Sequence, residues 1–303
     1  MTSGHDALRG LLGRVGAWTF AFDQRPIADV RIDAREIESL GFPALWVPEG
    51  GASRDVASHL AVLLASTGSI AVCSGIANIT ARQPEVLQAA AVTLVDGYGD
   101  RLVVGIGVGH EYSTERREVE WAHPLARTRA YLDRMDAADT ALPPPQSPVR
   151  RMLAALGDGM LRLSAERALG AHTYFVPVEH TAHARQVLGP EPVLAVEQTV
   201  VLGRSASIAR GIARAWAGHY LELPNYARNW LRLGYRDADV AGQGSDRLVD
   251  AGVAWGDVDA VVARVREHLV AGADHVCVQV IDEDDADACV PQLRELAPAL
   301  LDL

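Results

Sequence analysis

Residues 69–108 read SIAVCSGIANITARQPEVLQAAAVTLVDGYGDRLVVGIGV, and this stretch decides the expected fold. It begins with a short apolar run at about 69–76 and ends with LVVGIGV at 102–108, which is apolar continuously rather than alternately. Continuous apolarity is typical of a parallel strand that is buried on both faces. Between the two runs, Pro84 suits the first position of a helix, and one helical face carries Leu87, Ala91, Leu94 and Tyr98. The stretch therefore predicts a strand, a helix and a parallel strand.

The same alternation of short apolar runs and helical patterns continues along the chain. Helical patterns cover about 29–40, where Gly41 suits the end of a helix, and 56–66. Eight strand and helix units favour a closed (β/α)8 TIM barrel over an open sheet, and barrels of 303 residues form one domain, here 1–303. The other six predicted strands are 14–20, 44–48, 152–156, 171–176, 193–202 and 275–280.

The last predicted strand, HVCVQV at 275–280, alternates in polarity. Its three valines fit the side that faces the helices, and the preceding helical pattern, from Val258 to Leu269, has a matching apolar stripe. His275, Cys277 and Gln279 then face the barrel interior.

Three connections are longer than a barrel requires. LPPPQSP at 142–148 has the composition of a domain linker. Because strands of the same kind continue after it, we interpret it as a long, stiff loop within the barrel. The stretches 109–124 and roughly 219–256 predict insertions at the C-terminal face. Such insertions are usually lids or dimer contacts, so we expect a homodimer.

Composition narrows the class of partner. No apolar run approaches the roughly 20 residues of a membrane span, and the first ten residues lack a secretory pattern, which indicates a cytoplasmic protein with no membrane partner. The net charge is −11 with basic residues spread along the chain, which argues against nucleic acid and favours a small-molecule substrate. The three cysteines, Cys73, Cys277 and Cys289, include no CxxC pair and predict reduced thiols.

The chain contains no lysine, so all 28 basic residues are arginine. Schiff-base aldolases, pyridoxal-phosphate enzymes, P-loop NTPases and lysine-base enolases are excluded, because permanently protonated arginine cannot replace their lysine. The chemistry must come from carboxylates, histidines or a bound cofactor.

Candidate site residues follow the predicted strands, because barrel enzymes place catalytic groups at the C-terminal strand ends. Glu49 follows the second strand, 73–80 the third, and Gly107, Gly109 and His110 the fourth. Glycines in the fourth strand either pack against a neighbouring backbone or admit a flat group.

A further glycine-rich turn, LGDGM at 156–160, follows the fifth strand. Gly157 and Gly159 at a helix N-terminus can bind a phosphate through backbone N–H groups, or they can simply form a tight turn. Asp158 adds a negative charge that opposes the first interpretation.

These residues together resemble a known family. The quoted stretch, extended to HEY at 110–112, contains T-x-R-x-P-E and D-x-Y-G-D-R before its glycine-rich strand, and WVPEG at 46–50, LGDGM and EHTAHARQVLG at 179–189 add to it. Over nearly the whole chain the sequence is similar to the luciferase-like flavin and deazaflavin oxidoreductases. The resemblance implies a (β/α)8 barrel and favours the branch that depends on coenzyme F420.

The resemblance also implies roles for individual residues. It places a bulge with a non-proline cis peptide, supporting the central cofactor ring, near Ser74, Gly75 and Ile76. The phosphate would meet Gly157, Asp158 and Gly159, and Glu49 matches an acidic position near the ring. The groups flanking the ring and tail would be Asn78, Gly107, Val108, Gly109 and His110.

One departure from the family pattern concerns proton transfer. Many deazaflavin relatives have an acidic residue followed by histidine after the second strand, whereas Gly50 follows Glu49 here. Proton transfer would fall to Glu49 or to His110. A solvent-facing loop histidine is the alternative interpretation of His110.

We expect no metal. His180 and His183 have a helical spacing that can bind one, but a surface helix explains them better, and AWTF at 17–20 lacks the paired histidines of barrel metallohydrolases. Trp18, Trp46 and Trp216 are expected in the core or in a pocket wall.

Three functions remain open. The first is hydride transfer between F420 and a small organic substrate, in which the protein orients the cofactor and excludes water. The second is an FMN-dependent monooxygenase. The third is a non-catalytic, cofactor-binding paralogue, which the missing histidine and Asp158 would suit.

Overall fold

Eight parallel strands close into a barrel in the computed structural model, which describes residues 3–50, 53–111, 123–139, 142–282 and 289–303. Each strand pairs with the next, and the last pairs with the first, Val15 opposite Val276. The predicted (β/α)8 TIM barrel is confirmed. Its strands are β1 Val15–Trp18, β2 Ala44–Val47, β3 Ala71–Ser74, β5 Leu102–Gly107, β6 Arg150–Ala154, β7 Gly170–Thr173, β8 Val193–Leu202 and β10 His275–Val280.

Two short strands extend this ring. β4, Ala77–Asn78, pairs with β5 beyond the end of β3. β9, Val253–Gly256, pairs with the outer half of β8, from Thr199 to Leu202. β9 was not predicted, and it lies at the end of the stretch 219–256 that the sequence predicted as an insertion. β8 is ten residues long, so its last residues project past the ring and offer an edge to β9.

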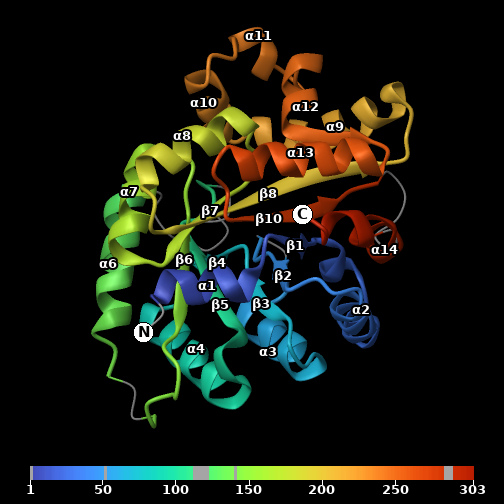
Figure 1. Cartoon of the computed structure of the whole chain (residues 1–303). Helices are drawn as coiled ribbons and strands as arrows, with labels where there is room; N and C mark the ends of the chain where they lie inside the picture. The colour runs from blue at the N-terminus through green and yellow to red at the C-terminus, as the bar shows by residue number, and fades with distance from the viewer. Residues whose placement is uncertain (1–2, 51–52, 112–122, 140–141, 283–288) are drawn as a thin grey trace.

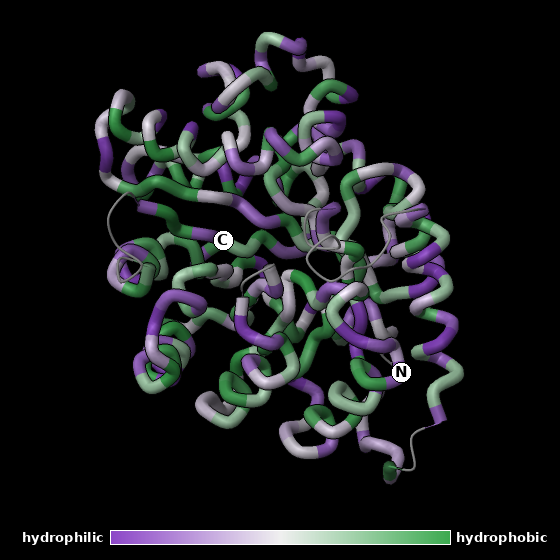
Figure 2. The backbone as a smooth tube through the Cα atoms, turned by 180° about the vertical axis from the view of Figure 1, so that it is seen from behind, coloured by the Kyte–Doolittle hydropathy of each residue, from purple (hydrophilic) through white to green (hydrophobic). Residues whose placement is uncertain are grey.

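Helices surround the barrel (Figure 1), and Pro84 and Gly41 take the predicted places at helix ends. Asp55 caps α3 by accepting from the Ser58 N–H, Pro84 opens α4, and Gly41, with φ of 95°, follows α2. The barrel helices are α2 Ile27–Ser39, α3 Val56–Ser66, α4 Pro84–Tyr98, α6 Pro124–Asp136, α7 Asp158–Arg167, α8 Val178–Leu188, α9 Ala206–Leu221, α13 Val258–Val270 and α14 Cys289–Leu300. Hydrophobic and hydrophilic segments follow one another along these outer helices (Figure 2).

The second predicted insertion is helical. After α9 the chain forms α10 Pro224–Arg232, α11 Asp237–Val240 and α12 Asp246–Gly252, which lie together at one edge of the molecule in Figure 1. We call α10 to α12 the lid helices. Of the first predicted insertion, 112–122 lies outside the described residues.

The barrel interior is closed at its N-terminal end by α1, Gly4–Leu12, whose Leu8 and Leu12 pack on inward-facing core residues. In β10 the predicted alternation is confirmed. Val276, Val278 and Val280 belong to the core beneath the helices, and Cys277 belongs to the interior cluster. All three cysteines are free and buried.

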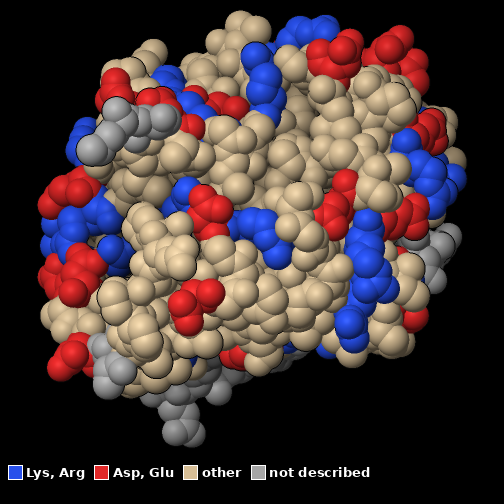
Figure 3. Space-filling model, turned by 60° about the horizontal axis from the view of Figure 1, so that its bottom comes forward, with Lys and Arg blue, Asp and Glu red and all other residues tan. Residues whose placement is uncertain are grey.

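Arginine and carboxylate side chains alternate on the face shown in Figure 3. Among the described residues, many arginines form ion pairs with carboxylates, as in Arg129 with Glu166 and Arg134 with Glu85. No helix among the described residues is both long and apolar enough to cross a bilayer.

Candidate active site

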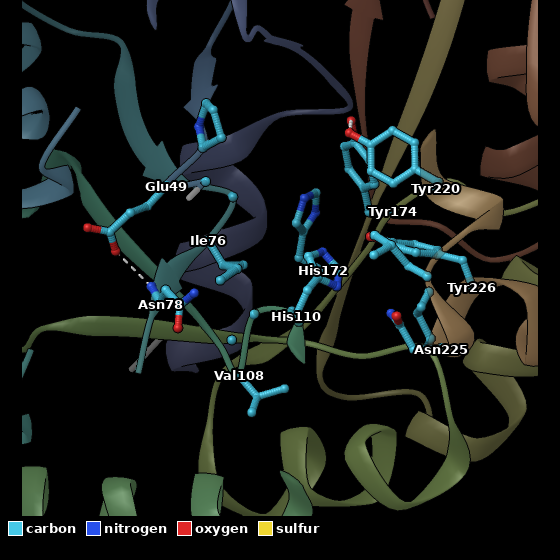
Figure 4. A pocket seen from close by; sticks show the side chains of 18 of the residues that line it. Glu49, Ile76, Asn78, Val108, His110, His172, Tyr174, Tyr220, Asn225 and Tyr226 are labelled. Carbon is cyan, nitrogen blue, oxygen red and sulfur yellow. Dashed lines mark hydrogen bonds between the residues drawn. The ribbon is translucent and has the colours of Figure 1, made fainter. Parts of the chain in front are cut away.

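A cavity of about 540 Å³ opens at the C-terminal ends of the strands. This volume falls within the roughly 300–1,000 Å³ typical of small-molecule sites. Figure 4 shows its two sides, with Glu49, Ile76 and Asn78 on one and Tyr174, Tyr220 and Tyr226 on the other. His110 and His172 lie between them.

The first side is built on an interruption of the third barrel strand. After β3 ends at Ser74, the Gly75–Ile76 peptide bond is cis, and the chain resumes extended pairing in β4. The expected bulge with a non-proline cis peptide is therefore confirmed. Ser74 Oγ donates to the Gly105 carbonyl at 2.9 Å, which ties the bulge to β5. Gly75, Ile76 and Asn78 line the cavity, whereas Ser74 lies beneath it.

The glycines of β5 make room for this bulge. A Cβ atom on Gly105 would lie 2.0 Å from the Ser74 carbonyl oxygen, and one on Gly107 would lie 2.7 Å from the Ile76 side chain. Gly109 has φ of 71°, and a Cβ there would lie 2.2 Å from Asn78 Nδ2. The structure thus supports the packing interpretation of the series. Gly107, Val108 and Gly109 also line the cavity.

Glu49 is only 8% exposed, and both of its carboxylate oxygens accept hydrogen bonds. Its Oε2 accepts from the Asn78 N–H and from Arg82 Nη1, each at 2.8 Å. Its Oε1 accepts from Arg82 Nη2 and from the Val56 N–H at the start of α3. In Figure 4 the carboxylate turns toward Asn78 and away from the tyrosines. Glu49 is thereby suited to hold the bulge.

His110 lines the cavity and contacts the lid helices, which does not support its solvent-facing alternative. Its ring centroid lies 5.7 Å from that of Tyr226. Burial lowers the pKa of His110 to about 4, a hydrogen bond with the Asn225 side chain partly opposes this shift, and the charge of His219 adds to it. His110 is therefore neutral at pH 7, and one of its ring nitrogens carries a lone pair.

The second side of the cavity is aromatic, and the sequence analysis missed most of it. Trp18, which was expected in the core or a pocket wall, lies 4.6 Å from Phe20 and 5.2 Å from Tyr174 between ring centroids. Tyr174 donates to Gln279 Oε1 at 2.8 Å, and its hydroxyl lies 2.9 Å from that of Tyr220. The rule that strand ends carry site residues would have found Trp18 and Tyr174, but not Tyr220, which α9 supplies.

A buried carboxyl group supports this wall from inside the barrel. Glu197 on β8 accepts from the Phe175 N–H at 3.1 Å and from Thr199 Oγ1 at 2.6 Å. Phe175 has φ of 51°, a left-handed conformation that non-glycine residues rarely adopt. Because Phe175 follows Tyr174, Glu197 positions the backbone next to the aromatic wall. Burial raises the pKa of Glu197 to about 8, although both hydrogen bonds oppose the shift.

The predicted phosphate turn begins α7. Gly157 is the N-cap residue and lines the cavity, but Asp158 and Gly159 lie outside the lining. The carboxylate of Asp158 pairs with His183 Nε2 at 2.7 Å and with Arg162 at 3.4 Å. Arg232 of α10 stands next to Gly157, because a Cβ on that glycine would lie 3.0 Å from its Nη1. Basic groups thus surround the Asp158 charge.

The histidine pair of α8 does not act as a unit. His180 is buried on the inner face of the helix and its Nε2 lies 2.8 Å from the Leu156 carbonyl oxygen, whereas His183 faces Asp158. Within the described ranges no group of three or more metal-ligating side chains comes together.

Comparison with known proteins identifies the family. The profile of luciferase-like monooxygenases matches residues 12–275, which is most of the chain. The chain belongs to the luciferase-like monooxygenase family. Among curated relatives, the 5,10-methylenetetrahydromethanopterin reductase of Methanolobus tindarius is 28% identical over 104 residues, 34% of this chain and 32% of that protein. That of Archaeoglobus fulgidus is 33% identical over 92 residues, 30% and 28% respectively. The chain therefore aligns with about a third of these relatives' length.

Solved structures show the same luciferase-like barrel. An F420-dependent secondary alcohol dehydrogenase has a TM-score of 0.75 at 14% identity, covering 95% of this chain and 98% of that one. The F420-dependent tetrahydromethanopterin reductase from Methanopyrus kandleri has a TM-score of 0.71 at 16% identity, covering 95% and 100%. The oxygenating constituent of 3,6-diketocamphane monooxygenase from Pseudomonas putida, in complex with FMN, has a TM-score of 0.68 at 17% identity, covering 94% and 96%.

These identities establish a shared fold rather than a shared reaction. The luciferase-like family contains oxidoreductases and monooxygenases, and the structural neighbours include both F420-dependent and FMN-binding proteins. In this luciferase-like barrel, the cavity combines an apolar aromatic wall, a neutral histidine and a helix N-terminus. That combination suits a large planar redox cofactor next to a small organic substrate.

Proposed function

We propose that this chain is an F420-dependent oxidoreductase that exchanges a hydride with a small, uncharged organic substrate. The observation that carries the proposal is the cavity at the barrel mouth, bounded by the Gly75–Ile76 bulge on one side and by Tyr174, Tyr220 and Tyr226 on the other. The F420-dependent dehydrogenase and the F420-dependent reductase among the solved structures support the choice of cofactor.

The residues present fit a planar ring with an anionic tail. Ile76 and Val108 offer apolar surface beside the bulge, where glycines at 105, 107 and 109 allow close packing of the backbone. At the other end of the cavity, Gly157 begins α7, and a helix N-terminus stabilises a phosphate. Arg232 adds a positive charge there, which offsets the Asp158 carboxylate.

The chain's own groups would bind, orient and handle protons. F420, when bound, supplies or accepts the hydride. His110 holds the proton-transfer position in this proposal, because its ring is neutral at pH 7 and faces the cavity. Glu49 orients Asn78 and the bulge instead of moving a proton, since Arg82 and two backbone N–H groups occupy its carboxylate. The aromatic wall excludes water and packs against the substrate.

Among the described residues that line the cavity, none is arginine, and the chain has no lysine. A substrate carboxylate or phosphate in the aromatic part would lose its hydration without gaining a permanent counter-charge. An uncharged alcohol, aldehyde or ketone avoids this cost.

An FMN-dependent monooxygenase is the second candidate, and the FMN-bound structural neighbour favours it. A non-catalytic, cofactor-binding paralogue is the third, since Gly50 stands where many deazaflavin relatives have a histidine.

Cofactor titrations followed by turnover separate these functions. We expect F420 to bind more tightly than FMN. We also expect either anaerobic reoxidation of the reduced F420 complex by an aldehyde or ketone, seen as return of the deazaflavin absorption band, or reduction of the oxidised F420 complex by an alcohol, seen as loss of that band. Tighter binding of FMN, with oxygen consumption when a flavin reductase is added, would contradict the proposal. Binding of F420 without any turnover by a broad substrate panel would favour the non-catalytic paralogue.

A further inference from the structure

Two buried side chains in the floor of the cavity, Trp18 and His172, have ring nitrogens without hydrogen bonds among the described residues. Trp18 is 1% exposed and His172 is 2% exposed. Neither Trp18 Nε1 nor either ring nitrogen of His172 has a hydrogen-bond partner among the residues that the structure describes. The Ala195 carbonyl stands near the His172 ring, but outside hydrogen-bonding geometry. Leaving a buried polar group unpaired is unfavourable, so these nitrogens destabilise the protein when no ligand is bound.

Trp18 Nε1 and His172 Nε2 both lie close to Gly75. A Cβ atom on Gly75 would lie 2.5 Å from Trp18 Nε1 and 3.2 Å from His172 Nε2, and all three residues line the cavity. The space beside the Gly75 Cα atom is therefore within reach of both. Because residue 75 is glycine, no side chain enters this space.

A second indole in the barrel interior shows the contrast. Trp46 stacks on His172 with ring centroids 4.6 Å apart, and its Nε1 donates to His275 Nε2 at 3.1 Å. His275 Nδ1 in turn donates to the Gly13 carbonyl at 2.9 Å. Trp46, which does not line the cavity, is thus hydrogen-bonded within the barrel interior, whereas Trp18 Nε1 and His172 Nε2, at the cavity, have no partner among the described residues.

The chemistry of this floor selects an uncharged hydrogen-bond acceptor. The indole N–H can only donate. Burial lowers the pKa of His172 to about 3, so its ring is neutral and can place its single proton on Nε2. No arginine contributes to the described lining, and a buried anionic oxygen would therefore lack a permanent counter-charge. A carbonyl oxygen meets both requirements.

We propose that Trp18 Nε1 and His172 Nε2 together bind one neutral carbonyl oxygen of a ligand beside Gly75. The identity of the ligand rests on the proposed function. The carbonyl can belong to the pyrimidine part of a flavin or deazaflavin ring, or to the organic substrate. Both sources present the same group to the same two donors.

Four variants test the pair. Trp18→Phe removes the indole N–H, and His172→Phe removes both imidazole nitrogens while keeping a ring against Trp46. The double variant tests coupling. Trp230→Phe is the matched control, because Trp230 is equally buried and its Nε1 also lacks a partner among the described residues, but it belongs to α10 and lies outside the cavity lining. Each protein is titrated with F420 and with FMN, and then, loaded with the tighter cofactor, with acetophenone.

In each single cavity variant we expect the dissociation constant of one ligand class, cofactor or acetophenone, to rise about tenfold, and in the control we expect no change. The two effects should be non-additive, since both nitrogens bind the same oxygen. A weaker F420 or FMN complex, together with an upward shift of a ring carbonyl stretch in the infrared difference spectrum, assigns the ring as the source. Unchanged cofactor binding with weaker acetophenone binding assigns the substrate.

The inference is overturned if the wild type binds a cofactor and acetophenone and both single variants keep these affinities. Failure of the wild type to bind F420 or FMN would instead contradict the proposed function. In that case acetophenone binding to the unloaded variants still tests the pair.

Discussion

A single carboxylate shows how burial decides a residue's role. Glu49 stands where the family resemblance places an acidic group near the ring, and its sequence context cannot reveal its partners. In the structure, Arg82 and two backbone N–H groups bind it. The side chains of Glu49 and Arg82 are only 5% and 10% exposed, so their ion pair is screened little by solvent.

Glu49→Gln should therefore act on stability. Removing one partner of a buried ion pair leaves the other charge uncompensated, and we expect the free energy of unfolding to fall by about 3 kcal/mol. Asp55→Asn is the control, since Asp55 also contacts Arg82 but is half exposed, and its loss should cost less than about 1 kcal/mol. Urea denaturation measures both. If both variants lose the same small amount of unfolding free energy, Glu49 does not stabilise the fold and is again a candidate for proton transfer.

A second carboxyl group, that of Glu197, makes the stability of the protein depend on pH. The pKa of Glu197 is raised to about 8 by burial, so the folded protein keeps a proton that the unfolded chain releases near pH 4.5. The folded state then binds more protons than the unfolded state between these values, and stability falls as pH rises through this window.

Glu197→Gln should remove this pH dependence, because an amide resembles the protonated acid. Relative to wild type, we expect the variant to gain about 2 kcal/mol between pH 6 and pH 8.5, measured as the change in urea midpoint. Parallel curves for the two proteins across this range would mean that Glu197 is ionised in the fold.

At the scale of elements, the β5 glycines explain why the bulge and its neighbour strand occur together. Gly105, Gly107 and Gly109 lie opposite Ser74, Ile76 and Asn78, where a side chain would collide with the bulge. From the sequence alone, close packing and direct cofactor contact were equally consistent with this spacing.

Gly105→Ala should disturb the bulge. Its Cβ would lie 2.0 Å from the Ser74 carbonyl oxygen, a backbone atom that cannot rotate away, and we expect a loss of about 3 kcal/mol in the free energy of unfolding. Gly97→Ala is the matched control within α4, with no atom within 4 Å, and it should stabilise the protein by about 0.5–1 kcal/mol. Similar results for both substitutions, by chemical denaturation, would show that β5 and the bulge are not closely packed.

Elements also differ in how well the sequence predicts them. The strands of the ring were predictable, because continuous apolar runs such as LVVGIGV are typical of parallel strands that are buried on both faces. β9 was not, since four residues, VAWG, give no period, and its partner is the projecting end of β8. Tyr220, Asn225 and Tyr226 also could not be assigned to the site from the sequence. Tyr220 comes from α9, and Asn225 and Tyr226 come from the lid helix α10, so their positions depend on how these helices fold over the barrel mouth.

At the scale of the whole molecule, buried histidines make the fold sensitive to acid. Six of them have a pKa of about 3 or 4, in each case lowered mainly by burial: His59, His110, His172, His180, His268 and His275. The unfolded chain takes up these protons near pH 6.5 and the folded chain does not. Stability is therefore present above pH 6.5 and is lost as pH falls toward 4.

We expect the urea midpoint to fall steadily between pH 6.5 and pH 5, with a loss of several kcal/mol in total. Glu197 opposes this trend, but it is one group against six. Added salt should leave the slope nearly unchanged, because buried groups are screened little. A constant midpoint from pH 7.5 to pH 5 would contradict the burial of these rings.

The central claim is that the barrel mouth receives a large planar cofactor. Ala154 at the C-terminal end of β6 lines the cavity, and Ala154→Phe would fill part of it, whereas Ala126→Phe on the exposed face of α6 would not. The most direct measurement is the dissociation constant of F420 for these two variants and the wild type, by fluorescence titration. We predict one site in the wild type and in Ala126→Phe, and at least a hundredfold loss in Ala154→Phe with an unchanged circular dichroism spectrum. Equal F420 affinity in all three proteins would contradict the account.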